Sequence, residues 1–234
     1  MAKFTVVGGE ASSDLAKRIA RKIKSPYIKT EKKVFPDGES KITINQIPKK
    51  SIVVVVQSTY PPVDSNLLEL LSIVSKVQKF SSKVYAVIPY MGYARQDREF
   101  LGGEIITIGV VGKLLKAAGV KKVLTVDIHS KLALKELKIS SENVSAMEVL
   151  VKHFKKMKMK NPVVVSPDMG GKERAEKFSK LLKTDFIALK KQRNRKTGKV
   201  KILSEKVDVK DRDLILVDDM ISTGGSIIKA TQFL

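Results

Sequence analysis

The sequence contains no cysteine among its 234 residues. This absence excludes disulfide bonds, thiolate catalysis and cysteine-ligated zinc. The chain also lacks a run of about 18 apolar residues, the length that a membrane-spanning helix needs. Its first residues, MAKFTVVGGEASSD, lack the apolar core of a signal peptide. We therefore expect a soluble, cytoplasmic protein with no membrane partner.

Acidic residues are few, since 24 Asp and Glu stand against 45 Lys and Arg, a formal net charge of +21. Such a charge raises the question of nucleic-acid binding. The basic residues are spread along the chain, and no zinc-finger, RNP or helix-turn-helix signature accompanies them. The densest run, VKHFKKMKMKNP (151–162), is typical of one amphipathic helix end. We expect a lysine-rich solvated surface and no nucleic-acid partner; salt-sensitive RNA binding is the least favoured alternative.

Short β-branched runs alternate with helical patterns along the whole chain. Runs that are apolar at successive positions indicate strands buried on both faces, and they occupy residues 3–9, 51–57, 83–89, 122–128, 162–168, 185–190 and 213–219. Apolar residues at helical spacing predict helices over 14–23, 66–80 and 107–119, the last ended by Gly119. This alternation predicts an α/β fold whose mostly parallel sheets are flanked by helices.

Two features modify that simple alternation. Residues 29–47 instead predict two short strands around a Pro-Asp-Gly turn. No linker rich in Pro, Gly or Ser marks a domain boundary, but one run of βα units gives way to a second near residues 140–150. We therefore predict two α/β domains, 1–144 and 145–234.

An aspartate stands at or just beyond the end of three predicted strands: Asp127, Asp168 and Asp218. In a parallel sheet the carboxyl ends of the strands meet at one edge, and ligands bind along that edge. Each aspartate alone is explained by capping of a following helix. Three at equivalent positions favour one or two ligand clefts.

A loop of small and hydroxylated residues, 222–226, follows the last predicted strand and precedes an apolar stretch typical of a helix. Backbone N–H groups and the helix dipole make such a loop suitable for an anion. No Walker motif is present, so the loop is expected to hold a phosphate monoester without a lysine. Asp218 and Asp219 would repel that phosphate if they faced it. They suit instead a pair of neighbouring hydroxyls or a divalent cation, and a ribose 5-phosphate group satisfies both halves of the pattern.

Further motifs accompany this loop. LILVDDMISTGGS (214–226) looks like the phosphoribosyl-diphosphate-binding motif, which phosphoribosyltransferases and ribose-phosphate diphosphokinases share. Other segments resemble the diphosphokinases in order and spacing: FPDGE (35–39), QSTYPPVDSNLLELL (57–71), YMGYARQDR (90–98), TVDIHS (125–130) and SPDMGG (166–171). The resemblance covers nearly the whole chain. It implies two phosphoribosyltransferase-like domains.

The resemblance also implies the reaction, which is transfer of the β,γ-diphosphoryl group of ATP to the 1-hydroxyl of ribose 5-phosphate, dependent on Mg²⁺. On the sugar side, Asp218 and Asp219 would hold ribose hydroxyls, and Asp168 would lie beside the ribose and its metal. The 5-phosphate would be held by Ser222, Thr223, Gly224, Gly225 and Ser226.

The remaining site residues are also implied by the resemblance. The nucleotide would be bound by Phe35, Asp37, Glu39, Arg95, Gln96 and Asp97. Mg²⁺ would lie near His129, Asp127 and Asp168; because magnesium prefers oxygen ligands, Asp168 is the safer contact. Family members carry a catalytic Lys-x-Arg pair on a loop, which maps onto Lys191 and Arg193, although Lys190 and Arg195 lie close enough to blur this assignment.

Two alternatives stay open beside this prediction. A phosphoribosyltransferase would share the phosphate loop, but it leaves FPDGE, YARQD and VDIHS unexplained. A non-catalytic regulatory homologue would be expected to lose loop or metal residues, which are present here. The resemblance further implies at least a homodimer with the ATP site shared between subunits. Because relatives continue for several more strands and helices, it also implies a second domain truncated at Leu234.

Overall fold

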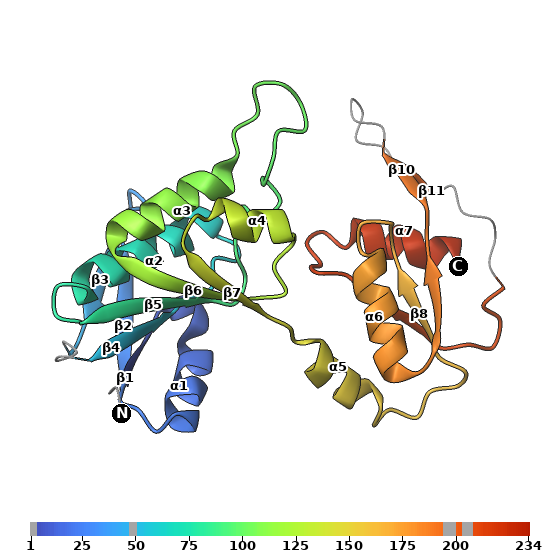
Figure 1. The fold of residues 1–234 in the computed structure, drawn as a ribbon, viewed down its shortest axis with the longest axis horizontal. Helices are drawn as coiled ribbons and strands as arrows, with labels where there is room; N and C mark the ends of the chain where they lie inside the picture. Colours follow the sequence, from blue (N-terminus) through green and yellow to red (C-terminus); the bar gives the residue numbers. More distant parts are fainter. Residues whose placement is uncertain (1–3, 47–50, 194–199, 203–207) are drawn as a thin grey trace. The chain divides into compact units, whose positions relative to one another are not determined.

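The computed structural model describes residues 4–46, 51–193, 200–202 and 208–234; for 191–193 and 200–202 it describes the backbone alone. The chain divides into two compact units, Met1–Ser145 and Ala146–Leu234. The sequence places the division one residue earlier. Figure 1 shows the helices and strands of both units.

The first unit is built on one seven-stranded sheet with the order β3-β2-β1-β4-β5-β6-β7. Its strands are β1 (Phe4–Gly8), β2 (Tyr27–Val34), β3 (Ser40–Ile44), β4 (Ile52–Val56), β5 (Lys83–Ile88), β6 (Val120–Val126) and β7 (Ser140–Val144). All neighbouring strands are parallel except β2 and β3, which form an antiparallel hairpin. The carboxyl ends of the parallel strands therefore meet at one edge.

Helices cover both faces of this sheet (Figure 1). They are η1 (Glu10–Ser12), α1 (Ser13–Lys22), α2 (Val63–Val77), α3 (Thr107–Ala118) and α4 (Lys131–Glu136). Val7, Val53 and Val55 belong to the core cluster that also contains buried residues of α2, α3 and α4. Val6 and Val54 point the other way and pack with α1, because successive side chains of a strand face opposite sides.

The second unit contains a smaller parallel sheet, β12-β8-β9. Its elements are α5 (Met147–Phe154), β8 (Val163–Ser166), α6 (Lys172–Leu182), β9 (Asp185–Ala188), β10 (Lys191–Arg193), β11 (Val200–Ile202), β12 (Leu214–Leu216) and α7 (Gly225–Phe233). The short strands β10 and β11 pair antiparallel. One core cluster holds side chains of α5, α6, β8 and β12, and a second holds Ala230 of α7 with β8.

The predicted α/β class is confirmed, and each of the seven predicted apolar strands overlaps an observed one; β6 begins two residues before its predicted range, at Val120. The hairpin and the end of α3 are confirmed as well, since Gly119 adopts a left-handed φ of 111° and closes the helix. The run 151–162, interpreted as one amphipathic helix end, contains the last residues of α5, which ends at Phe154. Lys160 is instead held in an irregular segment, where its N–H donates to Asp213 Oδ2 at 2.6 Å.

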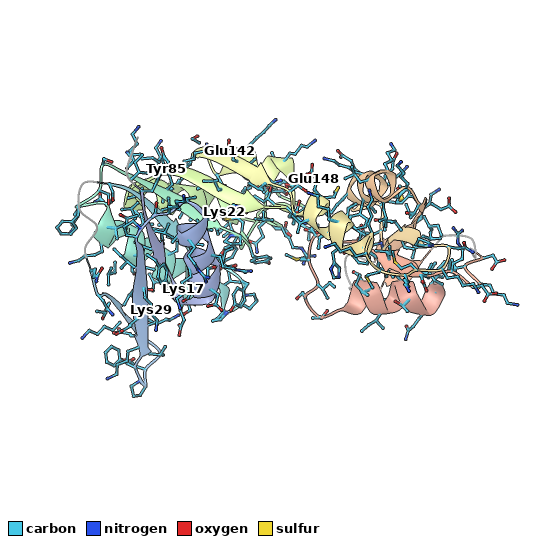
Figure 2. The ribbon with its side chains drawn as sticks, turned by 90° about the horizontal axis from the view of Figure 1, so that it is seen from below. Lys17, Lys22, Lys29, Tyr85, Glu142 and Glu148 are labelled. Atoms are coloured by element: carbon cyan, nitrogen blue, oxygen red, sulfur yellow. The ribbon has the colours of Figure 1, made fainter. Side chains whose placement is uncertain are left out.

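The surface carries much of the positive charge in dispersed form. Lys17 and Lys22 on α1 and Lys29 on β2 are exposed, and all three are labelled in Figure 2. In the described part of the chain, no helix is both long enough and apolar enough to cross a membrane.

Helix α3 approaches α4 so closely that one of its positions admits only glycine. A Cβ on Gly112 would lie 2.1 Å from the backbone oxygen of Leu137, whereas a Cβ on Gly109, one turn earlier, would meet nothing closer than 3.7 Å. We expect Gly112→Ala to destabilise the protein by about 1–3 kcal/mol through overpacking. Gly109→Ala is the matched control and should stabilise α3 by up to about 1 kcal/mol. Urea unfolding of both variants checks this, and equal effects would contradict the packing described here.

Candidate active site

The loop between β12 and α7 leads into a helix N-terminus. Gly224 adopts a left-handed φ of 76°, and the nine-residue helix α7 begins at Gly225. The Thr223 hydroxyl accepts the N–H of Gly225 at 3.5 Å, while Ser222, Thr223 and Ser226 are exposed. The first N–H groups of a helix and its positive dipole end attract anions. The sequence-predicted loop thus has the backbone arrangement of a phosphate cradle.

Three carboxylates gather beside this loop. Strands β8 and β12 are parallel neighbours, so Asp168 and Asp218, which follow them, lie at the same sheet edge. Asp168 Oδ1 accepts the N–H of Gly171 at 3.0 Å, and Asp218 Oδ1 accepts the N–H of Asp219 at 2.9 Å. These bonds hold the carboxylates ahead of the phosphate loop, where they can accept from hydroxyl groups.

Arg174 on α6 is a member of this group that the sequence did not reveal. Its Nη1 lies 3.8 Å from Asp218 Oδ1 and 3.5 Å from Asp219 Oδ1. The available signal was its place in the first turn of the helix after SPDMGG, where a side chain lies close to the carboxyl ends of the strands. The guanidinium offsets part of the negative charge of the acid pair.

A cavity of about 370 Å³ opens beside the acid pair. Apart from Asp218 and Asp219, its lining residues are apolar: Leu150, Phe154, Phe178, Ile215, Leu216, Val217, Met220, Ile221 and Ile227. This burial is the largest cause that raises the pKa of Asp218 to about 6, and a side-chain hydrogen bond with Asp219 and the charges of Asp219 and Asp168 also raise it. Asp218 is therefore ionised at neutral pH but takes up a proton in mild acid.

The raised pKa of Asp218 makes stability depend on pH. Between about pH 4 and pH 6 the folded protein keeps a proton that the unfolded chain has lost. The stability contributed by this proton is present below about pH 4 and is lost as the pH rises through about 6. We expect the loss of stability to be about 1 kcal/mol. This is less than the full pKa difference between the folded and unfolded states implies, because solvent screens a partly exposed carboxyl.

Urea unfolding of the metal-free wild type and of Asp218→Asn at about pH 4.5 and about pH 7.5 isolates this contribution from other titrating groups. The wild type should lose about 1 kcal/mol relative to the variant between the two values. A constant difference between the two proteins would show that the pKa of Asp218 is ordinary.

In the first unit, the loop after β5 carries three predicted nucleotide ligands in two different environments. Arg95 and Gln96 are exposed, whereas Asp97 is 3% exposed. Arg98 Nε donates to Asp97 Oδ1 at 2.9 Å and Arg98 Nη2 donates to Asp97 Oδ2 at 3.0 Å. This pairing, above all, lowers the pKa of Asp97 below its ordinary value. Arg95 and Gln96 are thus accessible to a ligand, and Asp97 is enclosed.

The neighbouring loop after β6 carries the predicted metal residues Asp127 and His129. Asp127 has a left-handed φ of 43°, and its Oδ1 accepts the Ser145 hydroxyl at 2.9 Å. His129 is exposed. Because β5 and β6 are parallel neighbours, both loops emerge from the same edge of the sheet.

The tip of the β2–β3 hairpin holds Phe35, Asp37 and Glu39. The N–H of Phe35 donates to the Glu39 backbone oxygen at 2.8 Å, and the N–H of Glu39 donates to Asp37 Oδ1 at 3.0 Å. Gly38 takes the turn's left-handed φ of 91°. The Phe35 ring is 37% exposed, and its centroid lies 5.5 Å from the Lys33 ammonium, so the ring is accessible on a hydrogen-bonded turn.

Lys191 and Arg193, the predicted catalytic pair, lie on β10, where Lys191 pairs with Ile202 and Arg193 with Val200. Their side chains, and all of Arg195, lie outside the described residues. Lys190 is exposed at the end of the segment that leads from β9.

The predicted Mg²⁺ residues fall in both units, with Asp127 and His129 in the first and Asp168 in the second. Among the residues that the structure describes, no group of three or more His, Cys, Asp or Glu side chains is arranged to hold a metal ion. The carboxylates of Asp127 and Asp168 do offer the oxygen donors that Mg²⁺ prefers. Since Mg²⁺ commonly takes one or two carboxylates together with substrate phosphates and water, each of these carboxylates by itself suits an ion that arrives with its substrate.

Family models match almost the whole chain. Residues 4–119 match the N-terminal domain of ribose phosphate pyrophosphokinase, and residues 143–234 match the phosphoribosyl transferase domain. Together with the parallel sheet, the acid pair and the phosphate loop, these matches define the class as that of phosphoribosyl transferase-type α/β proteins.

Similarity to individual proteins shows which family within this class the chain belongs to. The chain is 36% identical over 233 residues to a ribose-phosphate pyrophosphokinase of Sulfurisphaera tokodaii, covering 97% of this chain and 78% of the relative. It is 39% identical over 229 residues to one of Pasteurella multocida, covering 97% and 73%. The crystal structure of phosphoribosylpyrophosphate synthetase from Mycobacterium smegmatis has a TM-score of 0.83 and 27% identity, with 99% of this chain and 76% of that one covered. This chain belongs to the ribose-phosphate pyrophosphokinase family.

Proposed function

We propose that this protein transfers the β,γ-diphosphoryl group of ATP to the 1-hydroxyl of ribose 5-phosphate. The oxygen of that hydroxyl bonds to the β-phosphorus, the bond from the β-phosphorus to the α,β-bridging oxygen breaks, and AMP leaves while the hydroxyl proton is released. The observation that carries the proposal is the acid pair directly ahead of the α7 N-terminus. A sugar diol matches the acid pair, and a terminal phosphate matches the N-terminus of α7. The named relatives carry out this class of reaction.

The residues of the second unit bind the acceptor in this proposal. Asp218 and Asp219 accept hydrogen bonds from the ribose hydroxyls, and residues 222–226 hold the 5-phosphate with backbone N–H groups and hydroxyls. Arg174, whose Nη1 lies close to both carboxylates, offsets part of the negative charge of the acid pair. Asp168 lies at the same edge, beside the ribose.

The residues of the first unit bind the nucleotide. Arg95 and Gln96 contact phosphate oxygens, and the Phe35 face stacks on the adenine while Asp37 and Glu39 lie at the same turn. Mg²⁺, held by Asp168 or Asp127 with His129 nearby, would offset the negative charge of the transferred phosphates. Homodimers or larger assemblies, and a cytoplasmic location, stay predictions from the sequence.

Product analysis tests the proposal and separates it from a phosphoribosyltransferase. Incubation with ATP, ribose 5-phosphate and Mg²⁺ should yield AMP and phosphoribosyl diphosphate in equal amounts, and omission of the sugar phosphate should abolish AMP.

Asp219→Asn should raise the KM for ribose 5-phosphate by about tenfold, because it weakens one charged hydrogen bond to the sugar. Asp185→Asn, an exposed aspartate paired with Arg212 in the same unit, is the matched control. Release of diphosphate from phosphoribosyl diphosphate and a nucleobase, with no AMP from ATP, would establish the transferase instead.

A further inference from the structure

Both carboxylate oxygens of Asp97 already accept hydrogen bonds, and its side chain is almost completely buried. Arg98 binds both carboxylate oxygens, and the Ser130 hydroxyl donates a short hydrogen bond to Oδ2. Side-chain exposure of Asp97 is 2%, whereas that of Arg98 is 52%. The arginine therefore covers the carboxylate from the solvent side, and the serine holds it from within.

Ser130 joins this carboxylate to a second loop. The same hydroxyl accepts the N–H of Ala133 at 2.9 Å and so caps the N-terminus of α4. Ser130 directly follows His129, and Asp97 directly follows Gln96. The bond between residues 33 positions apart therefore ties the loop after β5 to the loop after β6.

The loop after β5 is anchored on its other side as well. Gln96 Oε1 accepts the Thr107 hydroxyl at 2.5 Å, and the Gln96 backbone oxygen accepts the N–H of Ile108 at 3.4 Å. Each exposed candidate ligand thus adjoins a fixed neighbour: Arg95 and Gln96 precede Asp97, and His129 precedes Ser130. Motion of one loop relative to the other would require the Asp97–Ser130 bond to break.

We propose that Asp97 and Ser130 are positioning residues that hold the exposed nucleotide ligands and His129 in one arrangement, so that ATP and its metal ion bind as a unit. This rests on the proposed function. It gives Asp97 a role other than direct nucleotide contact. Without the link, ATP binds to one loop and the ion loses its fixed relation to the phosphates.

The test measures ATP affinity by calorimetry with and without Mg²⁺, for the wild type, Asp97→Asn, Ser130→Ala and the double variant. In the wild type Mg²⁺ should strengthen ATP binding, and each single variant should reduce that gain by about tenfold. The double variant should reduce it by about the same tenfold, because both changes break one link. Ser130→Thr, which keeps the hydroxyl, should behave as the wild type, and the KM for ribose 5-phosphate should stay unchanged throughout.

Lys135→Gly is the matched control for loss of the α4 cap. Lys135 is exposed on α4, so glycine there weakens the helix by about 1 kcal/mol without touching Asp97. An equal effect in this control would overturn the proposal, and so would a loss of ATP affinity that is the same with and without Mg²⁺. A wild type that binds ATP with Mg²⁺ but forms no AMP would refute the proposed function while the binding data still decide this inference.

Discussion

Replacing Lys191 with alanine is expected to lower turnover by about 10²–10³-fold and to leave the KM for ribose 5-phosphate unchanged. The diphosphoryl group carries its negative charge through the transition state, and catalysis of such transfers depends on positioned cations. Lys191 and Arg193 stand at alternate positions of β10, so Arg193→Ala should cause a loss of similar size. Steady-state formation of AMP measures both.

Gln192→Ala is the matched control, because Gln192 lies between the two cations on the same strand and carries no charge. Its turnover should stay within about twofold of the wild type. Lys190→Ala tests whether the catalytic lysine is Lys190 or Lys191. A large loss in Lys190→Ala with normal turnover in Lys191→Ala would move the catalytic role by one residue and contradict the prediction.

Replacing Glu69 with alanine is expected to destabilise the first unit by about 3–5 kcal/mol, because it leaves a buried charge without its partner. Glu69 Oε2 lies 3.3 Å from Lys32 Nζ, with side-chain exposures of 0% and 6%. Glu69 Oε1 also accepts the N–H of Glu10 at 2.7 Å, and the Lys32 ammonium donates to Ser65. The carboxylate thus joins α2, β2 and the segment after β1.

Urea unfolding measures this effect, and Glu176→Ala is the control. Glu176 pairs with Lys180 on the surface of α6, with side-chain exposures of 41% and 74%, so its loss should change the stability far less than the loss of Glu69. Replacing both partners, as Lys32→Met with Glu69→Leu, should recover most of the stability. A small effect of Glu69→Ala, close to that of Glu176→Ala, would show that water reaches the pair.

The strands of the core were predictable from the sequence because burial on both faces leaves uninterrupted apolar runs, as in Ile52–Val56. Strand β7 was not predicted. It pairs only with β6, and most of its residues, SSENV, are exposed, so the hydrophobic pattern carries no sign of it. An edge strand of this kind is defined by backbone pairing alone.

The residues of the candidate site, like the strands, could be predicted from the sequence only in part. Asp168 and Asp218 could be placed together because the ends of neighbouring parallel strands share an edge. The enclosed environment of Asp97 could not be predicted from YARQDR, since one of its hydrogen-bond partners, Ser130, comes from a loop 33 residues away in the sequence. Arg174 was missed for the same reason, because its partners follow β12. Tertiary contacts between loops leave no local pattern in the sequence.

The position of β1 between β2 and β4, inside the seven-stranded sheet, has a consequence for the order in which the chain folds. Phe4 of β1 pairs with Ile52 of β4, which lies 48 residues later in the chain. The second edge of β1 therefore stays without its hydrogen-bond partners until β4 has been synthesised. Each further parallel pairing closes another long loop, which is slow in comparison with hairpin formation. All seven strands nevertheless lie within residues 4–144. During synthesis the first unit can therefore complete the hydrogen bonds of its sheet before the second unit has left the ribosome.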